Sequence, residues 1–470
     1  MRKKSCNFAF VKEIVRSIVL LGIPIIVGQL GTIAQQFADT IMVGHYGTDA
    51  LAAAGLVNNI FNLVIFFILG ISYASTPIIG SAFGSGNKRG VVQSLVESVI
   101  VNFAVSLVVV AGLSVLYLNI EVLNQPEEIL PLVKPYFLTL LLSVPFMAVF
   151  NALKQFSDAI GETKIPMWLM LASNVLNILL NWFLIFGVCG FPRLGLLGAG
   201  IATLLSRIFC LVALAAAIFY GKRYKCVFGD IGKGISVWWV RPAMPGMRHV
   251  LFVGLPISIQ LGLEASSFNI SAIFMGWIGA IALAAHQVMS TIATLCFQVI
   301  YGIGAAASVL ISQSRGADDW VKVRRIATSA FFLSLGVIVT IMTLIYVMRE
   351  PLVRCFTDSE EVVAASFALL PCFFLYQFGD TTQIVFANAL RGLERVKRMM
   401  LYAFIAYVMV SIPLSYFFAF VMQWGSVGVW MGMPFGLSTA GILFFLEFRR
   451  GVGVVSACWL LVVGCWLLVG

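Results

Sequence analysis

The sequence predicts an all-α polytopic membrane protein, with twelve transmembrane helices in two six-helix repeats around a central cleft. Three observations carry this prediction: an apolar composition, twelve apolar runs, and a first half that recurs in the second. Of the 470 residues, 61% are hydrophobic and 11% are charged, against about 45–50% and about 25% in soluble proteins. The mean hydropathy is +1.01. So little polar surface excludes a soluble enzyme, a disordered chain and a nucleic-acid-binding protein.

A helix needs about 20 predominantly apolar residues to cross the hydrocarbon core of a membrane. Twelve runs meet this length: 18–43, 50–76, 91–118, 130–153, 165–187, 196–220, 250–276, 280–311, 324–348, 362–389, 399–420 and 427–446. The tail 451–470 carries no charge and follows Arg449 and Arg450. A thirteenth span and a segment lying in the membrane interface both fit this tail.

The basic residues fall on one side of the predicted membrane. The net charge is +10, and 25 of the 30 Lys and Arg lie in the N-terminal segment and the loops on its side. Four lie in loops on the other side, and Arg207 lies inside the sixth run, where we expect a carboxylate or carbonyl partner. Because cytoplasmic loops are enriched in Lys and Arg, we expect a multi-pass protein of the cytoplasmic (inner) membrane with a cytoplasmic N-terminus.

The two halves overlay without a gap when the sequence is shifted by 232 residues. Gly22 then falls on Gly254, Pro24 on Pro256, and Leu51-Ala52-Ala53 on Leu283-Ala284-Ala285. Both copies have six spans and therefore enter the membrane from the same side, which places their symmetry axis along the membrane normal. The predicted organisation is an N-terminal lobe at 1–220, a basic cytoplasmic linker at 221–249, a C-terminal lobe at 250–446 and an apolar tail at 447–470.

Two acidic residues lie inside spans of the second lobe, where an ionisable group is expensive and marks function by default. Glu264 is central in the seventh span and shares a helix face with Gln260, Ser267 and Ser271. Asp380, in the tenth span, has Tyr376 four residues before it and Gln383 three residues after it. A carboxylate beside an aromatic ring attracts cations where water is excluded. We therefore predict a cation site here, with Na⁺ at Glu264 and Asp380 as one candidate.

A second candidate site lies in the first lobe. Asp39 is near the outer end of the first span, with Thr32, Gln35 and Gln36 on the same side. Asn177 and Asn181 share one face of the fifth span. Asparagines in a membrane also hold helices together, so this group is either a ligand cluster or a packing feature.

Other polar residues inside the predicted spans favour structural roles. Glu97 lies six residues into the third span, where a snorkelling or salt-bridged carboxylate is expected. His286 is predicted to pack inside the eighth span, and Gln287 follows it as a supporting polar group.

The charge within the spans also indicates the substrate. The predicted spans contain four acidic residues, Asp39, Glu97, Glu264 and Asp380, but only one arginine. This excess of negative charge favours cationic or amphipathic small molecules as substrates and a small cation as the coupling ion. The sequence has no P-loop that could bind ATP, its nine cysteines are scattered without metal-ligand spacing, and it has no nucleophile–base pair. We therefore expect no enzyme activity and no cofactor beyond coupling Na⁺ or H⁺. The expected partners are small-molecule substrates and membrane lipid, but no nucleic acid. We expect the protein to be a monomer.

Several stretches resemble the multidrug and toxic compound extrusion (MATE) family, and its NorM-like branch in particular. They include F-A-D-T-I-M-V-G at 37–44, N-V-L-N-I-L-L-N at 174–181, A-A-H-Q at 284–287, Y-Q-F-G-D-T-T-Q at 376–383 and A-L-R-G at 389–392. The resemblance covers about residues 10–446 and implies an antiporter that exports organic cations in exchange for Na⁺ or H⁺. It also implies a second-lobe cation site at Glu264, Asp380 and Tyr376, and a first-lobe site at Asp39, Asn177 and Asn181.

The sequence departs from the DinF-like branch of the family, which tends to carry aspartate where this chain has Asn181 and lacks the glutamate at 264. The main alternative is a flippase of lipid-linked oligosaccharides from the same wider superfamily, which predicts basic residues in the cleft. A channel or a membrane enzyme fits less well, because neither needs two similar lobes with unlike acids.

Overall fold

The computed structural model describes residues 2–123, 126, 129–228 and 241–453, and these form an all-helical bundle. The first-lobe helices are α1 (Arg2–Tyr46), α2 (Thr48–Tyr73), α3 (Ser75–Gly84), α4 (Lys88–Leu118), α5 (Leu130–Ala159), α6 (Lys164–Phe186), α7 (Leu196–Tyr220) and the short α8 (Lys225–Phe228). The second-lobe helices are α9 (Met244–Ile278), α10 (Ala280–Gly316), α11 (Trp320–Val347), α12 (Arg349–Arg354), α13 (Glu360–Gly392), α14 (Val396–Phe404), α15 (Ile412–Tyr416) and α16 (Gly425–Gly451).

Twelve of the described segments are long and apolar enough to cross a membrane, which confirms the predicted number of spans. Most helices extend a few residues beyond the predicted apolar runs. The eleventh span is irregular, since a π-helical segment at Ile405–Ser411 joins α14 to α15 and a second one, Phe417–Val421, follows α15. The expected thirteenth span or interfacial tail falls largely on 454–470, and the middle of the predicted linker on 229–240; both lie outside the described residues.

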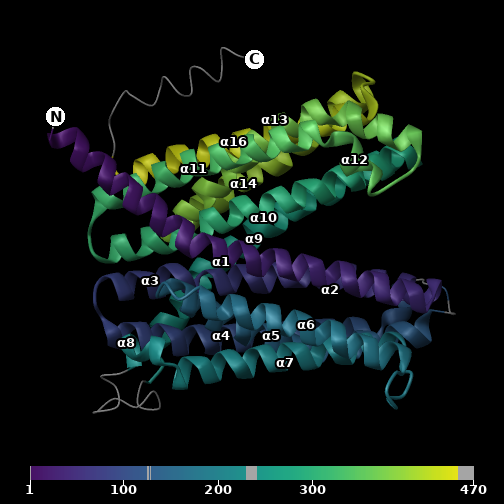
Figure 1. The fold of residues 1–470 in the computed structure, drawn as a ribbon, viewed down its shortest axis with the longest axis horizontal. Helices are drawn as coiled ribbons and strands as arrows, with labels where there is room; N and C mark the ends of the chain where they lie inside the picture. The colour runs from purple at the N-terminus through teal and green to yellow at the C-terminus, as the bar shows by residue number, and fades with distance from the viewer. Residues whose placement is uncertain (1, 124–125, 127–128, 229–240, 454–470) are drawn as a thin grey trace.

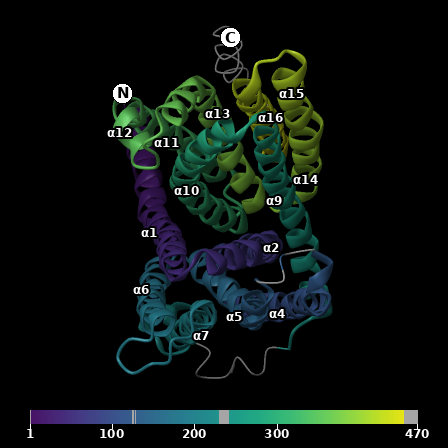
Figure 2. The same ribbon diagram turned by 90° about the vertical axis from the view of Figure 1, so that its right-hand side faces the viewer.

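The helices form two groups. Figure 2 shows α4 to α7 in one group and α9 to α16 in the other, with α1 and α2 at the boundary between them. The turns between α3 and α4, α5 and α6, and α10 and α11 lie at the end of the molecule where α1 begins (Figure 1). Because most Lys and Arg are at this end, we call it the basic end.

Close helix packing seals the two lobes together at the basic end. There α3 packs against α10, and α2 against α9. A Cβ atom at Gly84 would overlap the backbone of Gln313, and one at Gly70 would overlap the backbone of Ser258. Gly22 likewise approaches the carbonyl of Gly302, where a Cβ would lie 3.3 Å from the oxygen. Backbones this close hold the two lobes in direct contact on this side.

On the opposite half of the same interface, polar side chains of both lobes are exposed. Asn59 precedes Gly70 by eleven residues, or three helical turns, and therefore lies on the α2 face that packs against the second lobe near the basic end. On α10, Gln287 and Thr294 lie on the face that includes Tyr301, which contacts Tyr73 of the first lobe. All three of these polar side chains are exposed. We infer from these exposed polar groups that the central cleft opens away from the basic end.

Candidate cation sites in the two lobes

The second-lobe site forms where α9 and α13 lie in the same bundle. On α9, Gln260 and Glu264 are one turn apart, and on α13, Tyr376, Asp380 and Gln383 follow one face. Their exposed fractions are small: 0% for Gln260, 8% for Glu264 and 1% for Asp380. The structure thus brings together the five residues that the sequence placed in this lobe's site, apart from Gln287.

Two amides donate to the Glu264 carboxyl. Gln260 Nε2 lies 2.7 Å from Glu264 Oε2, and Gln383 Nε2 lies 3.2 Å from the same oxygen. The Gln383 bond joins α13 to α9 across 119 residues of sequence. Hydrogen bonds to an ionised carboxylate are stronger than those between neutral groups, so this arrangement suits a charged Glu264.

Other oxygens of the second-lobe site have no partner among the described residues. Asp380 Oδ1 and Gln383 Oε1 are both buried and make no hydrogen bond there. Leaving a buried acceptor unpaired costs free energy, and hard cations prefer carboxylate and amide oxygens. The site can therefore accept a small cation without rearranging its helices.

Aromatic rings enclose one side of this site. The Tyr376 ring lies 6.1 Å from that of Phe268 and 6.0 Å from that of Trp430, both edge to face. His286 packs on Trp430 with 5.6 Å between ring centroids, in keeping with the packing role expected for it. These rings exclude water and strengthen electrostatic attraction within the site.

The first-lobe site is built on a contact between α1 and α6. Asn181 Nδ2 donates to Asp39 Oδ1 at 2.6 Å and lies 3.2 Å from Asn177 Oδ1. Gly31 allows the two helices to approach, since a Cβ there would lie 2.7 Å from the Leu171 side chain. Asn177 and Asn181 are fully buried, whereas Asp39 is half-buried.

Two other groups lie in the same lobe. Tyr136 donates to Asn58 at 3.2 Å, and Arg207 donates to the Ser143 hydroxyl at 2.6 Å. The hydrogen bond of Arg207 goes to the Ser143 hydroxyl on α5 and not to a carboxylate or a carbonyl. Arg207 nevertheless lies close enough to interact electrostatically with Asp39.

Two of the expected supporting residues lie outside the clusters. Gln36 is exposed, whereas Gln35, its neighbour in sequence, is partly buried. Gln287 lies on the cleft-facing side of α10 and makes no side-chain hydrogen bond to Glu264 or Asp380 among the described residues.

Glu97 is buried rather than snorkelling, and it has no salt bridge among the described residues. It is 4% exposed and accepts from the backbone N–H of Ala243 at 3.0 Å, directly before α9 begins. A carboxylate at a helix N-terminus is favourable because the helix dipole is positive there. Glu97 thus joins α4 of the first lobe to the start of the second.

Sequence reasoning missed two buried cations, since it assigned Lys154 and Arg391 to loops. Lys154 lies in α5 and pairs with Asp158 at 2.8 Å, with side-chain exposures of 12% and 6%. Arg391 lies in the last turn of α13 and is 5% exposed. Arg391 follows Asp380 by eleven residues, or three turns, so the helical face of Asp380 was the signal that could have found it.

The fold and the sites together define a class of protein: a two-lobed membrane transporter with polar and acidic clusters inside its spans. The sequence model of the MatE family matches residues 24–183 and 256–417, and the two matches begin 232 residues apart. The chain belongs to the MatE family.

Relatives cover nearly the whole chain. A protein from Bradyrhizobium diazoefficiens named probable multidrug resistance protein NorM is 32% identical over 91% of this chain and 92% of its own. A protein of the same name from Geobacillus kaustophilus is 28% identical over 92% and 94%. The crystal structure of the eukaryotic MATE transporter AtDTX14 has a TM-score of 0.82 at 18% identity, covering 94% of this chain and 98% of that one. That last likeness shows the fold.

Proposed function

We propose that this MatE protein is a multidrug efflux transporter that exports organic cations and other xenobiotics in exchange for Na⁺ or H⁺. It works by alternating access, in which one binding region is open to each side of the membrane in turn. The chain acts as a monomer in the cytoplasmic membrane, with its N-terminus and its basic end in the cytoplasm. The open half of the cleft then faces outward.

One observation carries the proposal: a buried pair of carboxyls in the second lobe, Glu264 and Asp380, with Asp380 Oδ1 unpartnered among the described residues. Two buried carboxylates near one another are costly unless a cation or a proton neutralises them. A cation arriving from the outside through the open cleft would meet this need. Binding of a drug cation to the same carboxyls would then weaken, and the drug would be released.

The division of the chain supports rocking of the lobes. We propose that 1–220 and 250–446 move as two bodies, that 221–249 links them in the cytoplasm, and that 447–470 lies apart from the moving core. Glycine contacts such as those of Gly70 and Gly84 seal the cytoplasmic half in the state described above. Separation of these contacts, with closure of the outer half, would expose the sites to the cytoplasm.

Two roles follow for the sites. Glu264 and Asp380, with Tyr376 beside them, bind the coupling cation and compete with the drug. Gln260 and Gln383 hold the Glu264 carboxyl in place. Asp39, with Asn177 and Asn181, forms a second site in which a carboxyl can take up a proton and remain hydrogen-bonded.

Export of a lipid-linked oligosaccharide is not favoured. A lipid pyrophosphate would require several cations at the cleft surface, whereas the polar residues identified there are Asn59, Gln287 and Thr294. The relatives are also named for multidrug resistance.

The test uses purified protein in lipid vesicles with ethidium as a fluorescent cation. A sodium gradient and a pH gradient are imposed in turn. At least one gradient is expected to drive ethidium movement against its own concentration gradient, and an ionophore that collapses the gradient is expected to stop it. Ethidium movement that is the same with either gradient, with both or with none would overturn the proposal.

A further inference from the structure

A chain of hydrogen bonds runs from Glu264 to a guanidinium at the sealed end. Arg391 Nη2 donates to Gln260 Oε1 at 2.7 Å, and Gln260 Nε2 donates to Glu264 Oε2 at 2.7 Å. The three groups are a cation, an amide and an anion in order. Each bond is charge-assisted at one end, so both are stronger than bonds between neutral groups.

Arg391 decides which way the Gln260 amide points. An amide has one oxygen that accepts and one nitrogen that donates, and the two ends look alike in shape. Because the guanidinium can only donate, it selects the oxygen end of Gln260 and leaves the nitrogen for Glu264. Without this cation the amide could turn over and present its oxygen to the carboxylate, which would repel it.

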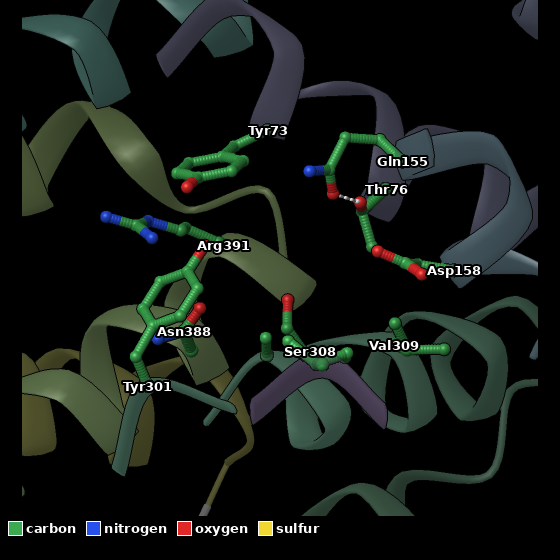
Figure 3. A pocket seen from close by; sticks show the side chains of 11 residues that line it. Tyr73, Thr76, Gln155, Asp158, Tyr301, Ser308, Val309, Asn388 and Arg391 are labelled. Atoms are coloured by element: carbon green, nitrogen blue, oxygen red, sulfur yellow. Dashed lines mark hydrogen bonds between the residues drawn. The ribbon is translucent and has the colours of Figure 1, made fainter. Parts of the chain in front are cut away.

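The other face of Arg391 contacts the first lobe. Its guanidinium carbon lies 5.5 Å from the centre of the Tyr73 ring, a distance at which a cation is attracted to the ring. Figure 3 shows Arg391 beside Tyr73 on the wall of a small polar cavity, with Asp158 and Gln155 on another wall. Arg391 and Tyr301, which also lines the cavity, belong to the second lobe, whereas Tyr73, Gln155 and Asp158 belong to the first.

The positive charge of Arg391 has one main source of balancing negative charge. Asp158 is the nearest first-lobe carboxylate on the cavity wall, but its Oδ2 pairs with Lys154 at 2.8 Å. Tyr73 and Tyr301 add hydroxyls and no charge at neutral pH. Arg391 Nε has no partner among the described residues. The negative charge that balances Arg391 therefore comes mainly from Glu264, through Gln260.

We propose that Arg391 is a positioning residue that couples cation binding at Glu264 to opening of the basic end. The proposal rests on the proposed function. While Glu264 is ionised and unoccupied, Arg391 is compensated and can remain buried against Tyr73, with the lobes sealed. A cation bound at Glu264 removes that compensation. Burying an unbalanced guanidinium is expensive, so the sealed half opens and the guanidinium gains water.

The test measures how far the lobes separate at the basic end. Spin labels are placed at two exposed positions in the terminal turns, through Arg89→Cys and Ala317→Cys, in a chain whose native cysteines have been replaced. We call these the basic-end pair. Distances are measured by double electron–electron resonance in potassium chloride, in sodium chloride, and at lowered pH.

Sodium is expected to raise the open fraction of the parent chain by about fivefold or more, within the usual range of coupling between two sites. In Arg391→Gln the increase in the open fraction is expected to fall below twofold. The guanidinium is absent there, so a cation bound at Glu264 leaves no buried positive charge unbalanced. Arg391→Lys, which keeps the charge, is expected to recover part of the response. Ethidium binding by Arg391→Gln should stay within about threefold of the parent, since the drug meets the carboxyls and not the guanidinium.

Arg315→Gln is the matched control. Arg315 lies at the same end of the molecule and pairs with Glu394 at 2.9 Å, and among the described residues it makes no hydrogen bond to Glu264, Gln260 or Gln383. This variant is expected to respond as the parent does. Gln260→Leu breaks the chain at its middle and is expected to lose the response as Arg391→Gln does, so the test stands even where one variant fails to fold.

A normal sodium response in both Arg391→Gln and Gln260→Leu would overturn this inference and leave the proposed function intact. A parent chain that responds to neither sodium nor acid, and that also fails to move ethidium in vesicles, would overturn the proposed function itself.

Discussion

Asn181 donates a 2.6 Å hydrogen bond to Asp39 from a position 142 residues further along the chain. The second lobe has no equivalent of this pair, because the repeat places Ser271 at the position of Asp39. Conversely, Asp380 corresponds to Ala148 and Glu264 to Thr32. The two lobes thus share a scaffold and differ in the chemistry of their buried polar groups. Different chemistry in similar folds indicates different roles in coupling.

The first prediction assigns ion dependence to each lobe. Glu264→Gln is expected to abolish the sodium dependence of ethidium export, because it removes a carboxylate from the lobe that holds two. Asp39→Asn is expected to abolish the pH dependence, because the remaining amides cannot take up a proton. Export is measured across sodium concentrations at fixed pH, and then across pH without sodium. Sodium dependence that persists in Glu264→Gln and disappears in Asp39→Asn would reverse the assignment.

The second prediction concerns whether the second-lobe carboxyls are needed at all. Glu264→Gln and Asp380→Asn keep the shape of each side chain and remove its charge. Export is expected to fall at least tenfold in each variant. Expression and membrane insertion should persist, since a neutral residue inside a span lowers the insertion cost by about 2–3 kcal/mol. Wild-type export by both variants would place the cation site elsewhere.

The third prediction concerns the seal between the lobes. A methyl group at Gly84 would overlap the Gln313 backbone, so Gly84→Ala is expected to destabilise the sealed basic end. The basic-end pair should move apart. A second label pair at the opposite end, made with Thr48→Cys and Ala280→Cys, should move together.

Gly336→Ala is the control for this third prediction. A Cβ at Gly336 meets nothing within 4 Å, so both distances should stay as in the parent. Unchanged distances in Gly84→Ala would show that the glycine contacts do not hold the lobes in this state.

The fourth prediction concerns stability at low pH. Glu394, between α13 and α14, lies 2.9 Å from His249 Nε2 and 2.9 Å from Arg315 Nη1. Burial raises the pKa of Glu394, and the hydrogen bond with His249 together with Arg315 outweighs burial and leaves the pKa below its ordinary value of 4.5. A lowered carboxyl pKa stabilises the folded chain above about pH 4.5, and this stabilisation is lost as the pH falls below that value.

Thermal unfolding in detergent tests this fourth prediction. Glu394→Gln is expected to lower Tm at pH 7, and the difference from the parent should narrow as the pH falls below 4.5. Glu121→Gln removes an exposed carboxylate that lies 3.4 Å from Lys134 and is expected to change Tm little. An equal loss of Tm for Glu394→Gln at pH 7 and pH 4 would contradict the prediction.

The twelve spans could be predicted because a membrane requires long apolar helices, and the glycine and proline positions of the repeat could be matched by a fixed shift. The grouping of Gln260 with Glu264, and of Tyr376 with Asp380, could be predicted from helical spacing alone. The hydrogen bond from Gln383 to Glu264 could not, because it depends on how α9 and α13 pack. The same limit applies to Asn181 and Asp39, which lie on different helices.

Arg391 shows why some of the site was missed. A hydropathy pattern ends a span at the first charged residue, so a charge in the last helical turn is assigned to a loop. In the fold, α13 continues to Gly392 and buries Arg391 against Gln260 and Tyr73. Lys154 was missed for the same reason, since α5 continues to Ala159 and pairs it with Asp158.

The measurement that tests the account most directly is the affinity for ethidium as a function of coupling cation. Purified protein in detergent is titrated with ethidium at increasing sodium concentration, and then at decreasing pH. The account predicts that sodium, protons or both weaken ethidium binding, and that ethidium weakens binding of that same cation by an equal factor, since coupling between two ligands is reciprocal. Ethidium affinity that is unchanged across both titrations would contradict exchange at a shared carboxylate.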